Sequence, residues 1–559
     1  MTRLLPSTQG GMRHIPPSPL FRFSCWSDLS NLAMPEVTIL ALQGRMNSGE
    51  LTAAGLVQTY LARIDSIDRA GPRLNAVLEL NPDALAIADA LDAERRERGP
   101  RGPLHGIPIL LKGNIDTADR MTTTAGSLAL AGSYAPQDAF IVQRLRLAGA
   151  LILGKANLSE WANFRSSHSS SGWSSQGGLT RNPYALDRSG CGSSTGSAVA
   201  VAADLCVAAI GTETDGSITC PAAVNGIVGL KPTLGLLSRS GVIPIAHSQD
   251  TAGPMARSVA DAAILLGALA GEDARDPATA VSSRQSPVNS KAKHLADNSL
   301  TTGHRSLFTD YVQFLHKDGL RGARIGVARQ YFGKYPKVDA IMEASLAAMR
   351  TLGAELIDLA APLPDDEIGE HELEVLLYEF KADLNAYLAS LGPGAPVKSM
   401  AEVIAFNDAH ADLAMPFFGQ ERMTQAQAKG PLSEEVYLNA LATSKRLAGA
   451  EGIDKALAAQ QLDAIVAPTT GPAWPIDLVN GDHSIGSCTT PAAVAGYPHI
   501  TVPAGSVFGL PVGISFFAGA WSEPTLLRLA YAFEQATQAR RAPSFLSTVN
   551  FDQRQVVSS

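Results

Sequence analysis

Apolar residues recur with the spacing of a helix between residues 52 and 70. The positions that share one face of this segment are Leu56, Val57, Tyr60, Leu61, Ile64 and Ile67. Thr52, just before them, has a side chain that can cap the N-terminus of a helix. The pattern therefore predicts an amphipathic helix that begins after Thr52.

A shorter apolar run without interruption follows at Pro108-Ile-Leu-Leu111 and ends at Lys112. A run of this kind, with no polar residue inside it, is typical of a strand that is buried on both faces. A helix is predicted over residues 139–149 and a strand over 151–153. Helix and strand then alternate again through residues 194–211.

The C-terminal half repeats this alternation. Strands are predicted over 324–328, 356–359, 463–467, 500–502 and 511–517, and helices over 338–352 and 523–540. Strands that alternate with helices favour an α/β fold. We expect a single large mixed β-sheet whose two faces are both covered by helices.

Two segments lie outside this pattern. Residues 1–36 have no periodicity and lack the apolar stretch of a secretory signal, which predicts a poorly ordered leader or a true start at Met34. Residues 273–305 are rich in Ser, Asp, Asn and Thr and predict a surface insertion. The pattern of the remaining chain predicts one domain over residues 37–547 and a tail over 548–559. A cytoplasmic location is the default expectation, and export stays open if the start is wrongly assigned.

Composition and charge narrow the class of protein. Of the 559 residues, 45% are hydrophobic and 18% are charged, which suits a large globular core and excludes a disordered chain. The net charge of −8 and the lack of a basic stripe argue against nucleic acid as a partner. No apolar run is long enough for a membrane-spanning helix, so none is expected.

The five cysteines are Cys25, Cys191, Cys206, Cys220 and Cys488. Their number is odd, their spacing is wide and no CxxC pair occurs, so neither a disulfide framework nor a zinc site is expected. Free cysteines are usually buried, which predicts free, mostly buried thiols here. On this interpretation Cys191 and Cys220 are packing residues.

The densest cluster of small and polar residues lies in 188–235. It contains the GxSxG pattern of a nucleophile elbow, with Ser194 as its serine. Asp463 and His499 could then serve as the acid and the base. The elbow must directly follow a buried strand, however, and the residues before it are polar. A phosphate loop is disfavoured because Ser197 stands where that loop needs a lysine.

Lys112 suggests a different chemistry for the serines of this cluster. A serine hydroxyl is a weak nucleophile until a base removes its proton. A lysine becomes such a base when burial lowers the pKa of its amine toward neutrality. Lys112 directly follows an apolar strand, where a buried amine is plausible. The sequence therefore identifies Lys112 as a candidate base.

Several separated stretches resemble the amidase signature family of serine hydrolases. They are 188–235, His105-Gly-Ile-Pro108, Leu111-Lys-Gly-Asn114, Gly154-Lys-Ala-Asn-Leu-Ser-Glu-Trp-Ala162, Asp250-Thr-Ala-Gly-Pro254 and Asp463-Ala-Ile-Val-Ala-Pro-Thr469. The resemblance covers residues 37–545, and the stretches follow the family's order. The peptide amidase branch is the most similar, on Trp161-Ala-Asn-Phe164, Glu213-Thr-Asp-Gly-Ser-Ile218, Leu376-Leu-Tyr-Glu-Phe380 and Ala520-Trp-Ser-Glu-Pro524.

The resemblance implies a Ser–cis-Ser–Lys triad. In it Lys112 is the base, Ser193 is the bridging serine in the cis conformation, and Ser217 is the nucleophile. The family places its oxyanion hole on the backbone amides of Thr214, Asp215, Gly216 and Ser217. It implies no metal and no organic cofactor. Asp215 departs from the glycine of many members, but the peptide amidase branch shares this aspartate.

The implied function is hydrolysis of amides through an acyl-enzyme. C-terminal peptide amides are the expected substrates, and no obligate protein partner is implied. Trp474, in the proline-rich segment 471–475, is our candidate for a wall of the groove that holds the acyl side. Two alternatives stay open. One is an amidotransferase-type subunit that supplies ammonia to a partner chain, and the other is an α/β-hydrolase-like esterase that uses Ser194.

Overall fold

The computed structural model describes residues 37–281 and 309–551. A compact unit begins at Thr38. The expected leader over 1–36, most of the expected insertion over 273–305 and the end of the expected tail lie outside the described residues. The domain boundaries drawn from the sequence therefore stay predictions.

In the part of the chain that the structure describes, eleven strands form one mixed sheet, which confirms the predicted fold class. Their order along the sheet is β1-β3-β2-β6-β8-β7-β12-β13-β11-β9-β10. Their bounds are Val77–Leu80 (β1), Pro108–Lys112 (β2), Leu151–Ala156 (β3), Ala208–Glu213 (β6), Val228–Lys231 (β7), Thr251–Ala256 (β8), Arg324–Val327 (β9), Glu355–Asp358 (β10), Ala464–Pro468 (β11), His499–Val507 (β12) and Leu510–Phe517 (β13). A separate ribbon joins β4 (Trp173–Ser174) to β5 (Gly178–Leu179).

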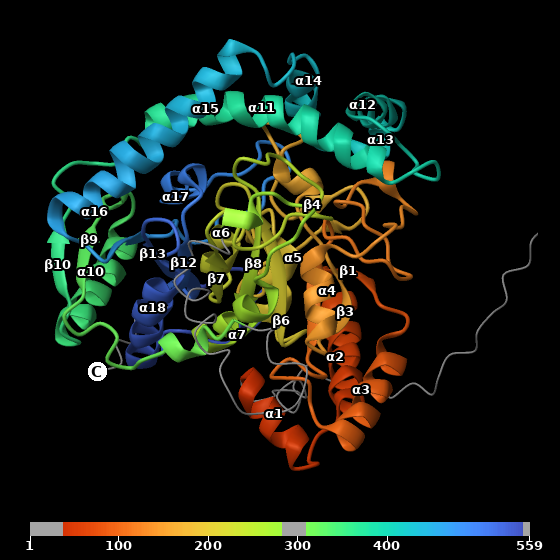
Figure 1. Ribbon diagram of the computed structural model, residues 1–559, viewed down its shortest axis with the longest axis horizontal. Coiled ribbons are helices and arrows are strands. Elements are labelled where there is room, and N and C mark those ends of the chain that lie inside the picture. Colours follow the sequence, from red (N-terminus) through yellow and green to blue (C-terminus); the bar gives the residue numbers. More distant parts are fainter. Residues whose placement is uncertain (1–36, 282–308, 552–559) are drawn as a thin grey trace, which may run out of the picture. The chain divides into compact units, whose positions relative to one another are not determined.

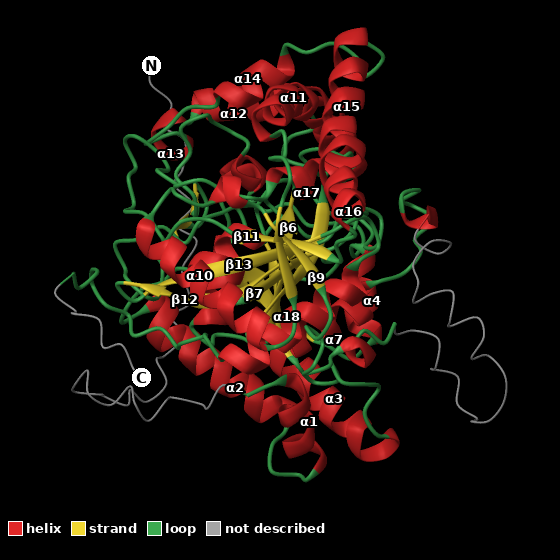
Figure 2. Cartoon of the chain, turned by 90° about the vertical axis from the view of Figure 1, so that its left-hand side faces the viewer, coloured by secondary structure: helices red, strands yellow, loops and turns green. Residues whose placement is uncertain are grey.

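The direction of each crossover decides which face a helix covers. From β2 the chain passes through α4 (Phe140–Leu147) to β3, and from β3 it returns past β2 through α5 (Thr195–Ala202) to β6. Crossovers between parallel strands are right-handed, and these two run in opposite directions along the sheet. Helices α4 and α5 therefore lie on opposite faces. Figure 2 shows helices on both sides of the strands.

Each face is completed by helices from later in the chain. On the face of α5, α6 (Thr219–Val224) follows β6 and packs against α5. On the face of α4, α7 (Val259–Leu269), α18 (Glu523–Thr537) and α10 (Pro336–Thr351) pack against one another in that order. The apolar side chains of the sheet are thus enclosed between two helical layers.

Within the described residues, three α-helices precede strand β2. They are α1 (Ile39–Asn47), α2 (Ala53–Arg63) and α3 (Ala84–Arg98). The predicted helix after Thr52 is confirmed, because α2 begins at Ala53 and the Thr52 side chain accepts a hydrogen bond from the amide of Gly55. A π-helical segment, Ile64–Arg69, directly follows α2.

Residues 365–460 add an outer layer for which the sequence analysis assigned no elements. Its helices are α11 (Asp365–Ser390), α12 (Met400–Ala409), α13 (Ala411–Ala414), α14 (Glu421–Gln427), α15 (Glu435–Ala448) and α16 (Asp454–Gln460). Figure 1 shows α11 and α15 packed together, with α17 (Thr490–Ala495) beneath them. Phe380 and Leu384 of α11 belong to the same buried hydrophobic cluster as Trp161 and Ile243. Among the described residues, no helix is both long and apolar enough to cross a membrane.

Strand β2 places the first candidate site residue. Its bounds, Pro108–Lys112, are those that the sequence predicted, and all five of its residues are buried. A strand between two parallel neighbours has both faces covered, so it requires an uninterrupted apolar run. Lys112 is the last residue of β2 and pairs with Ala156 of β3. The sheet thus carries the amine of Lys112 into the protein interior.

Candidate active site

Lys112 is fully buried and is hydrogen-bonded only to neutral groups of the described chain. Its Nζ lies 2.7 Å from Ser193 Oγ, 2.8 Å from Thr212 Oγ1 and 3.0 Å from Thr212 O. Burial lowers the pKa of Lys112 to about 7, and the negative charges of Asp250 and Glu213 oppose this shift only in part. A large fraction of the amine is therefore uncharged at neutral pH and can accept a proton.

Ser193 lies in the loop that leads into α5, and its side chain is buried. The peptide bond between Gly192 and Ser193 is cis. Ser193 O accepts a hydrogen bond from Ser159 N at 3.1 Å. A Cβ atom on Gly192 would lie 2.2 Å from Ser159 Oγ, so only glycine fits in front of Ser193.

Ser217 lies in the turn between β6 and α6. Its carbonyl oxygen accepts a hydrogen bond from Ser194 N at 3.2 Å, which joins this turn to the loop of Ser193. Gly216 before it has φ +75°, a left-handed conformation that favours glycine. The structure thus brings Lys112 to Ser193 directly. It brings Ser217 to them through the backbone, and no hydrogen bond links the two serine hydroxyls in the described chain.

The turn around Ser217 presents unpaired backbone amides. Within residues 37–281 and 309–551, the N–H groups of Asp215, Gly216 and Ser217 donate to no other group. The next two amides, of Ile218 and Thr219, are bound by Glu213 Oε2 at 2.7 and 2.9 Å. Consecutive free N–H groups beside a serine are the arrangement that an oxyanion requires.

Asp215 directs its side chain away from β6 toward α17. Its Oδ2 accepts a hydrogen bond from Thr490 Oγ1 at 2.6 Å, whereas its Oδ1 is buried and has no hydrogen-bond donor among the described residues. Burial raises the pKa of the Asp215 carboxyl, and Thr489, Thr490 and Lys231 oppose this rise. The Asp215 side chain therefore joins the turn that carries Ser217 to the start of α17.

Thr212 is a site residue that the sequence analysis missed. It presents both its carbonyl oxygen and its hydroxyl to Lys112, and its hydroxyl also accepts a hydrogen bond from Asn114 Nδ2 at 3.1 Å. It is the fifth residue of β6, the strand beside β2. Strand pairing could have identified it, because the C-terminal ends of adjacent parallel strands lie together.

Ser194 does not have the surroundings of an elbow nucleophile. It is fully buried, its Oγ donates to Thr212 O at 3.0 Å, and that Oγ accepts from Thr212 N at 3.2 Å. No strand leads directly into it. His499 is hydrogen-bonded to Ser515, and Asp463 accepts the amide of Arg324, so neither residue supports Ser194. These contacts argue against the esterase alternative.

Cys191 and Cys220 form a disulfide, which corrects the expectation of free thiols. Their Cα atoms are 6.1 Å apart although 29 residues separate them in sequence. The sequence pattern could not reveal this pairing, because the two residues come together only when the loop before α5 and helix α6 are folded against each other. The bond joins the loop before Ser193 to the helix after Ser217. Cys206 and Cys488 are free and buried, as expected.

Trp474 is buried beside the loop that carries Ser193. Only 6% of its surface is exposed. Its indole N–H donates to Asp482 Oδ1 at 3.0 Å, and its carbonyl oxygen accepts from Ser189 N at 2.8 Å. Trp474 thus supports the start of the loop that carries Cys191 and Ser193.

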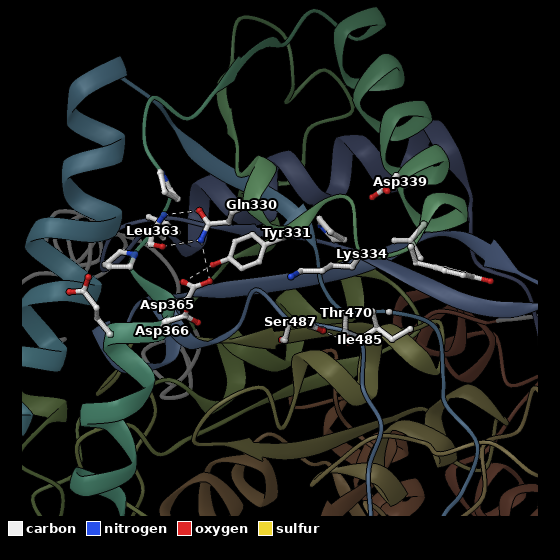
Figure 3. A pocket seen from close by; sticks show the side chains of 18 residues that line it. Gln330, Tyr331, Lys334, Asp339, Leu363, Asp365, Asp366, Thr470, Ile485 and Ser487 are labelled. Carbon is white, nitrogen blue, oxygen red and sulfur yellow. Dashed lines mark hydrogen bonds between the residues drawn. The ribbon is translucent and has the colours of Figure 1, made fainter.

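A cavity of about 520 Å³ lies beside the C-terminal ends of β9 and β11 (Figure 3). Its lining includes Tyr331, Lys334, Asp365 and Ser487, and none of Lys112, Ser193 and Ser217. Ser487 nevertheless links this cavity to the turn that carries Ser217. The Ser487 and Thr489 hydroxyls are 3.0 Å apart, and Thr489 Oγ1 would lie 3.1 Å from a Cβ atom on Gly216.

His247, Glu379 and Asp383 are the one group in the described chain whose ligand atoms lie close enough to hold a metal ion. Their carboxylates already accept hydrogen bonds, however. Asp383 accepts the amide of His247, and Glu379 accepts the amide of Ser248 and the hydroxyl of Tyr437. These contacts give the cluster a structural explanation that needs no ion.

Comparison with known proteins agrees with this geometry. The family model described as Amidase matches residues 55–527. An Arabidopsis thaliana relative named as a probable amidase is 40% identical over 527 residues, which is 93% of each chain. The solved peptide amidase of Stenotrophomonas maltophilia is 53% identical with a TM-score of 0.83, covering 92% of this chain and 99% of that one. A glutamyl-tRNA(Gln) amidotransferase subunit of Chloroflexus aurantiacus is 35% identical over 525 residues, covering 90% of this chain and 97% of that one.

Loss of the disulfide should destabilise the protein. A cross-link restricts the unfolded chain, so the variant Cys191→Ala/Cys220→Ala should lose roughly 2–4 kcal/mol of unfolding free energy. Denaturant titration with and without a reductant measures this. Reductant should lower the stability of the natural protein and leave the double variant unchanged. Equal stability of the natural protein in both conditions would contradict the pairing.

Proposed function

The chain belongs to the amidase family and is an amide hydrolase, and we propose that it removes the C-terminal amide of peptides through an acyl-enzyme formed on Ser217. The observation that carries this proposal is the buried Lys112, whose pKa is lowered to about 7 and whose Nζ lies 2.7 Å from Ser193 Oγ. A base of this kind is what a serine nucleophile lacks by itself.

The proposed mechanism begins with two proton transfers. Uncharged Lys112 takes the proton of Ser193, and Ser193 takes that of Ser217. Ser217 Oγ then forms a bond to the amide carbon, and the carbonyl oxygen becomes an oxyanion. The two hydroxyls are brought into contact when substrate binds, since catalytic hydrogen bonds are often loose in the free enzyme. The free amides of Asp215, Gly216 and Ser217 support the assignment of the oxyanion hole, each donor contributing about 3 kcal/mol. The family's fourth oxyanion donor would be the amide of Thr214.

The second half of the mechanism restores the enzyme. The C–N bond breaks as the proton on Lys112 returns through Ser193 to the leaving nitrogen, which departs as ammonia. Water then attacks the acyl-enzyme with the same base, and the peptide acid leaves. Every proton taken up is returned, so no metal or cofactor is required for this cycle.

The proposed specificity for peptide amides rests on the similarity to a peptide amidase and on the cavity beside Ser487. The solved relative that shares 53% of the sequence is a peptide amidase. The cavity of about 520 Å³ beside Ser487 has room for part of a peptide chain. We propose Trp474 as a wall of the groove for the acyl side, since its carbonyl oxygen accepts from Ser189 N beside the loop that leads to Ser193.

Supply of ammonia to a partner chain is the second candidate function, because of the similarity to a glutamyl-tRNA(Gln) amidotransferase subunit. The purified chain alone distinguishes the two. A peptide amidase releases ammonia from amidated peptides without any other protein. A member of a transamidation complex would release it only when its partner is added.

Replacement of the nucleophile should abolish turnover. Ser217→Ala should reduce ammonia release from an amidated dipeptide by about 10⁴–10⁶-fold, as for other nucleophilic serines. Ser194→Ala is the matched control. It should retain substantial activity and lose about 1–3 kcal/mol of stability, because it leaves Thr212 without one partner. A greater loss of activity in Ser194→Ala than in Ser217→Ala would contradict the assignment.

The base should be visible in the pH dependence. Protonated Lys112 has no lone pair, so kcat/KM should be low below the pKa of about 7, rise as the pH passes through it and then level off. Lys112→Ala should cost at least about 10²–10⁴-fold, the usual contribution of a positioned base. Buried Lys155, which bonds Ile115 O and Thr123, provides a control position outside this path. Near-normal amide hydrolysis by Lys112→Ala would refute the role.

The groove assignment of Trp474 makes a separate prediction. Trp474→Ala should raise KM for amidated peptides more than for small free amides, because only the longer substrate reaches the wall. The ratio of the two KM values for natural and variant protein is the measurement. Equal changes for both substrates would place Trp474 in packing of the Ser193 loop instead.

A further inference from the structure

Three acidic side chains share one face of α11. Glu372, Glu379 and Asp383 stand seven and four residues apart, a spacing that aligns side chains on one side of a helix. All three face a single loop, residues 245–250, which leads into β8. Figure 1 shows α11 as the long helix of the outer layer. The face that carries the acids therefore points inward.

The acids bind consecutive residues of this loop. Asp383, Glu379 and Glu372 accept hydrogen bonds, in that order, from His247 N at 2.8 Å, Ser248 N at 2.9 Å and Gln249 Nε2 at 2.7 Å. As the loop advances by one residue, the acid that binds it lies about one or two helical turns nearer the N-terminus of α11. The contact fixes the loop in both position and direction, because hydrogen bonds are directional.

The same loop holds Thr214, the first residue of the turn that carries Ser217. Asp250 Oδ1 accepts the hydroxyl of Thr214 at 2.5 Å, and Gln249 Nε2 also reaches Thr214 O at 3.4 Å. The other oxygen of Asp250 accepts the amides of Ile245 and Ala246 at 2.8 and 2.9 Å. Through its Nε2 atom alone, Gln249 therefore contacts both α11 and the turn that carries Ser217.

Attachment of α11 alone does not require these acids. Apolar residues such as Phe380 and Leu384 already bury the helix against the body of the protein. Carboxylates are costly to bury unless they are hydrogen-bonded, and Glu379 is fully buried. Burial and the nearby Asp215 carboxyl raise the pKa of Glu372 to about 8. What the three acids add is hydrogen bonds to consecutive residues of the loop 245–250.

We propose that Glu372, Glu379 and Asp383 are positioning residues, which act through the loop 245–250 to hold Thr214 and so to aim the free amides that follow it. The inference rests on the proposed function, because those amides matter only if an oxyanion forms on Ser217. The outer helices would then take part in catalysis without touching the substrate.

Inhibition by a peptide aldehyde tests directly whether the free amides after Thr214 are correctly positioned. Ser217 Oγ adds to its carbonyl carbon, the C=O double bond becomes a single bond, and the serine proton passes through Ser193 to Lys112. The resulting oxyanion occupies the same amides as in the reaction. The matching peptide alcohol binds without this bond. The ratio of the two inhibition constants, alcohol over aldehyde, therefore reports the state of the oxyanion site separately from ordinary binding.

The variants remove single links of the chain. Gln249→Met keeps the side-chain length and loses both hydrogen bonds, and Glu372→Met removes the acceptor that Glu372→Gln keeps. Glu374→Gln is the control, since Glu374 lies on another face of α11 and pairs with Lys429. Melting temperatures identify variants that do not fold. Asp383→Ala, at the more exposed end, replaces any such variant.

Gln249→Met and Glu372→Met should lower both kcat and the inhibitor ratio about tenfold, with KM changed less than about twofold. This loss is smaller than the 10²–10³-fold loss on removal of an entire oxyanion donor. Glu372→Gln should restore both values, Asp383→Ala should lower them about threefold, and Glu374→Gln should match the natural protein. Folded variants with an unchanged inhibitor ratio would overturn the inference. If the natural protein itself showed no preference for the aldehyde, the proposed function would fail first.

Discussion

Burial of Lys112 is the constraint around which the rest of the site is arranged. An ammonium group cannot be taken out of water without a large cost, so the protein must either neutralise the amine or pair it with a carboxylate. Here its three hydrogen-bond partners come from the uncharged residues Ser193 and Thr212, while Asp250 and Glu213 act on it only electrostatically. The amine is thus kept close to the point where it exchanges a proton at neutral pH. The position of β2 between β3 and β6 produces both the burial of the amine and its lowered pKa.

Two cross-links then bring the serine segments to this amine. The Ser194 amide holds the carbonyl of Ser217, and the disulfide joins Cys191 to Cys220 just outside the two serines. Both contacts connect residues far apart in sequence through β6, α5 and α6. The turn at Ser217 is left with free amides because Glu213 binds only the two amides beyond it. Reactivity in this site depends on which polar groups the fold leaves without a partner.

Most strands of the sheet were predictable from local patterns, because a buried strand is a short run of consecutive apolar residues. Strand β2 was predicted with its observed bounds, and β9, β10 and β11 lie within one or two residues of their predicted positions. The helices of 365–460 were not predicted. In α11, buried acids stand among the apolar residues, and this obscures the apolar stripe by which an amphipathic helix is recognised. The disulfide and the role of Thr212 depend on long-range pairing, which neither spacing nor composition encodes.

The central claim is that Lys112, through Ser193, activates Ser217 for covalent attack on an amide carbonyl. Its most direct test is to trap the acyl-enzyme, by rapid acid quench of the protein during turnover of an activated peptide ester, and to map the modified residue by mass spectrometry. The account predicts one acyl group on Ser217 of the natural protein and its loss when Lys112 is replaced by alanine. An acyl group on Ser194, or an undiminished one on Ser217 without Lys112, would contradict it.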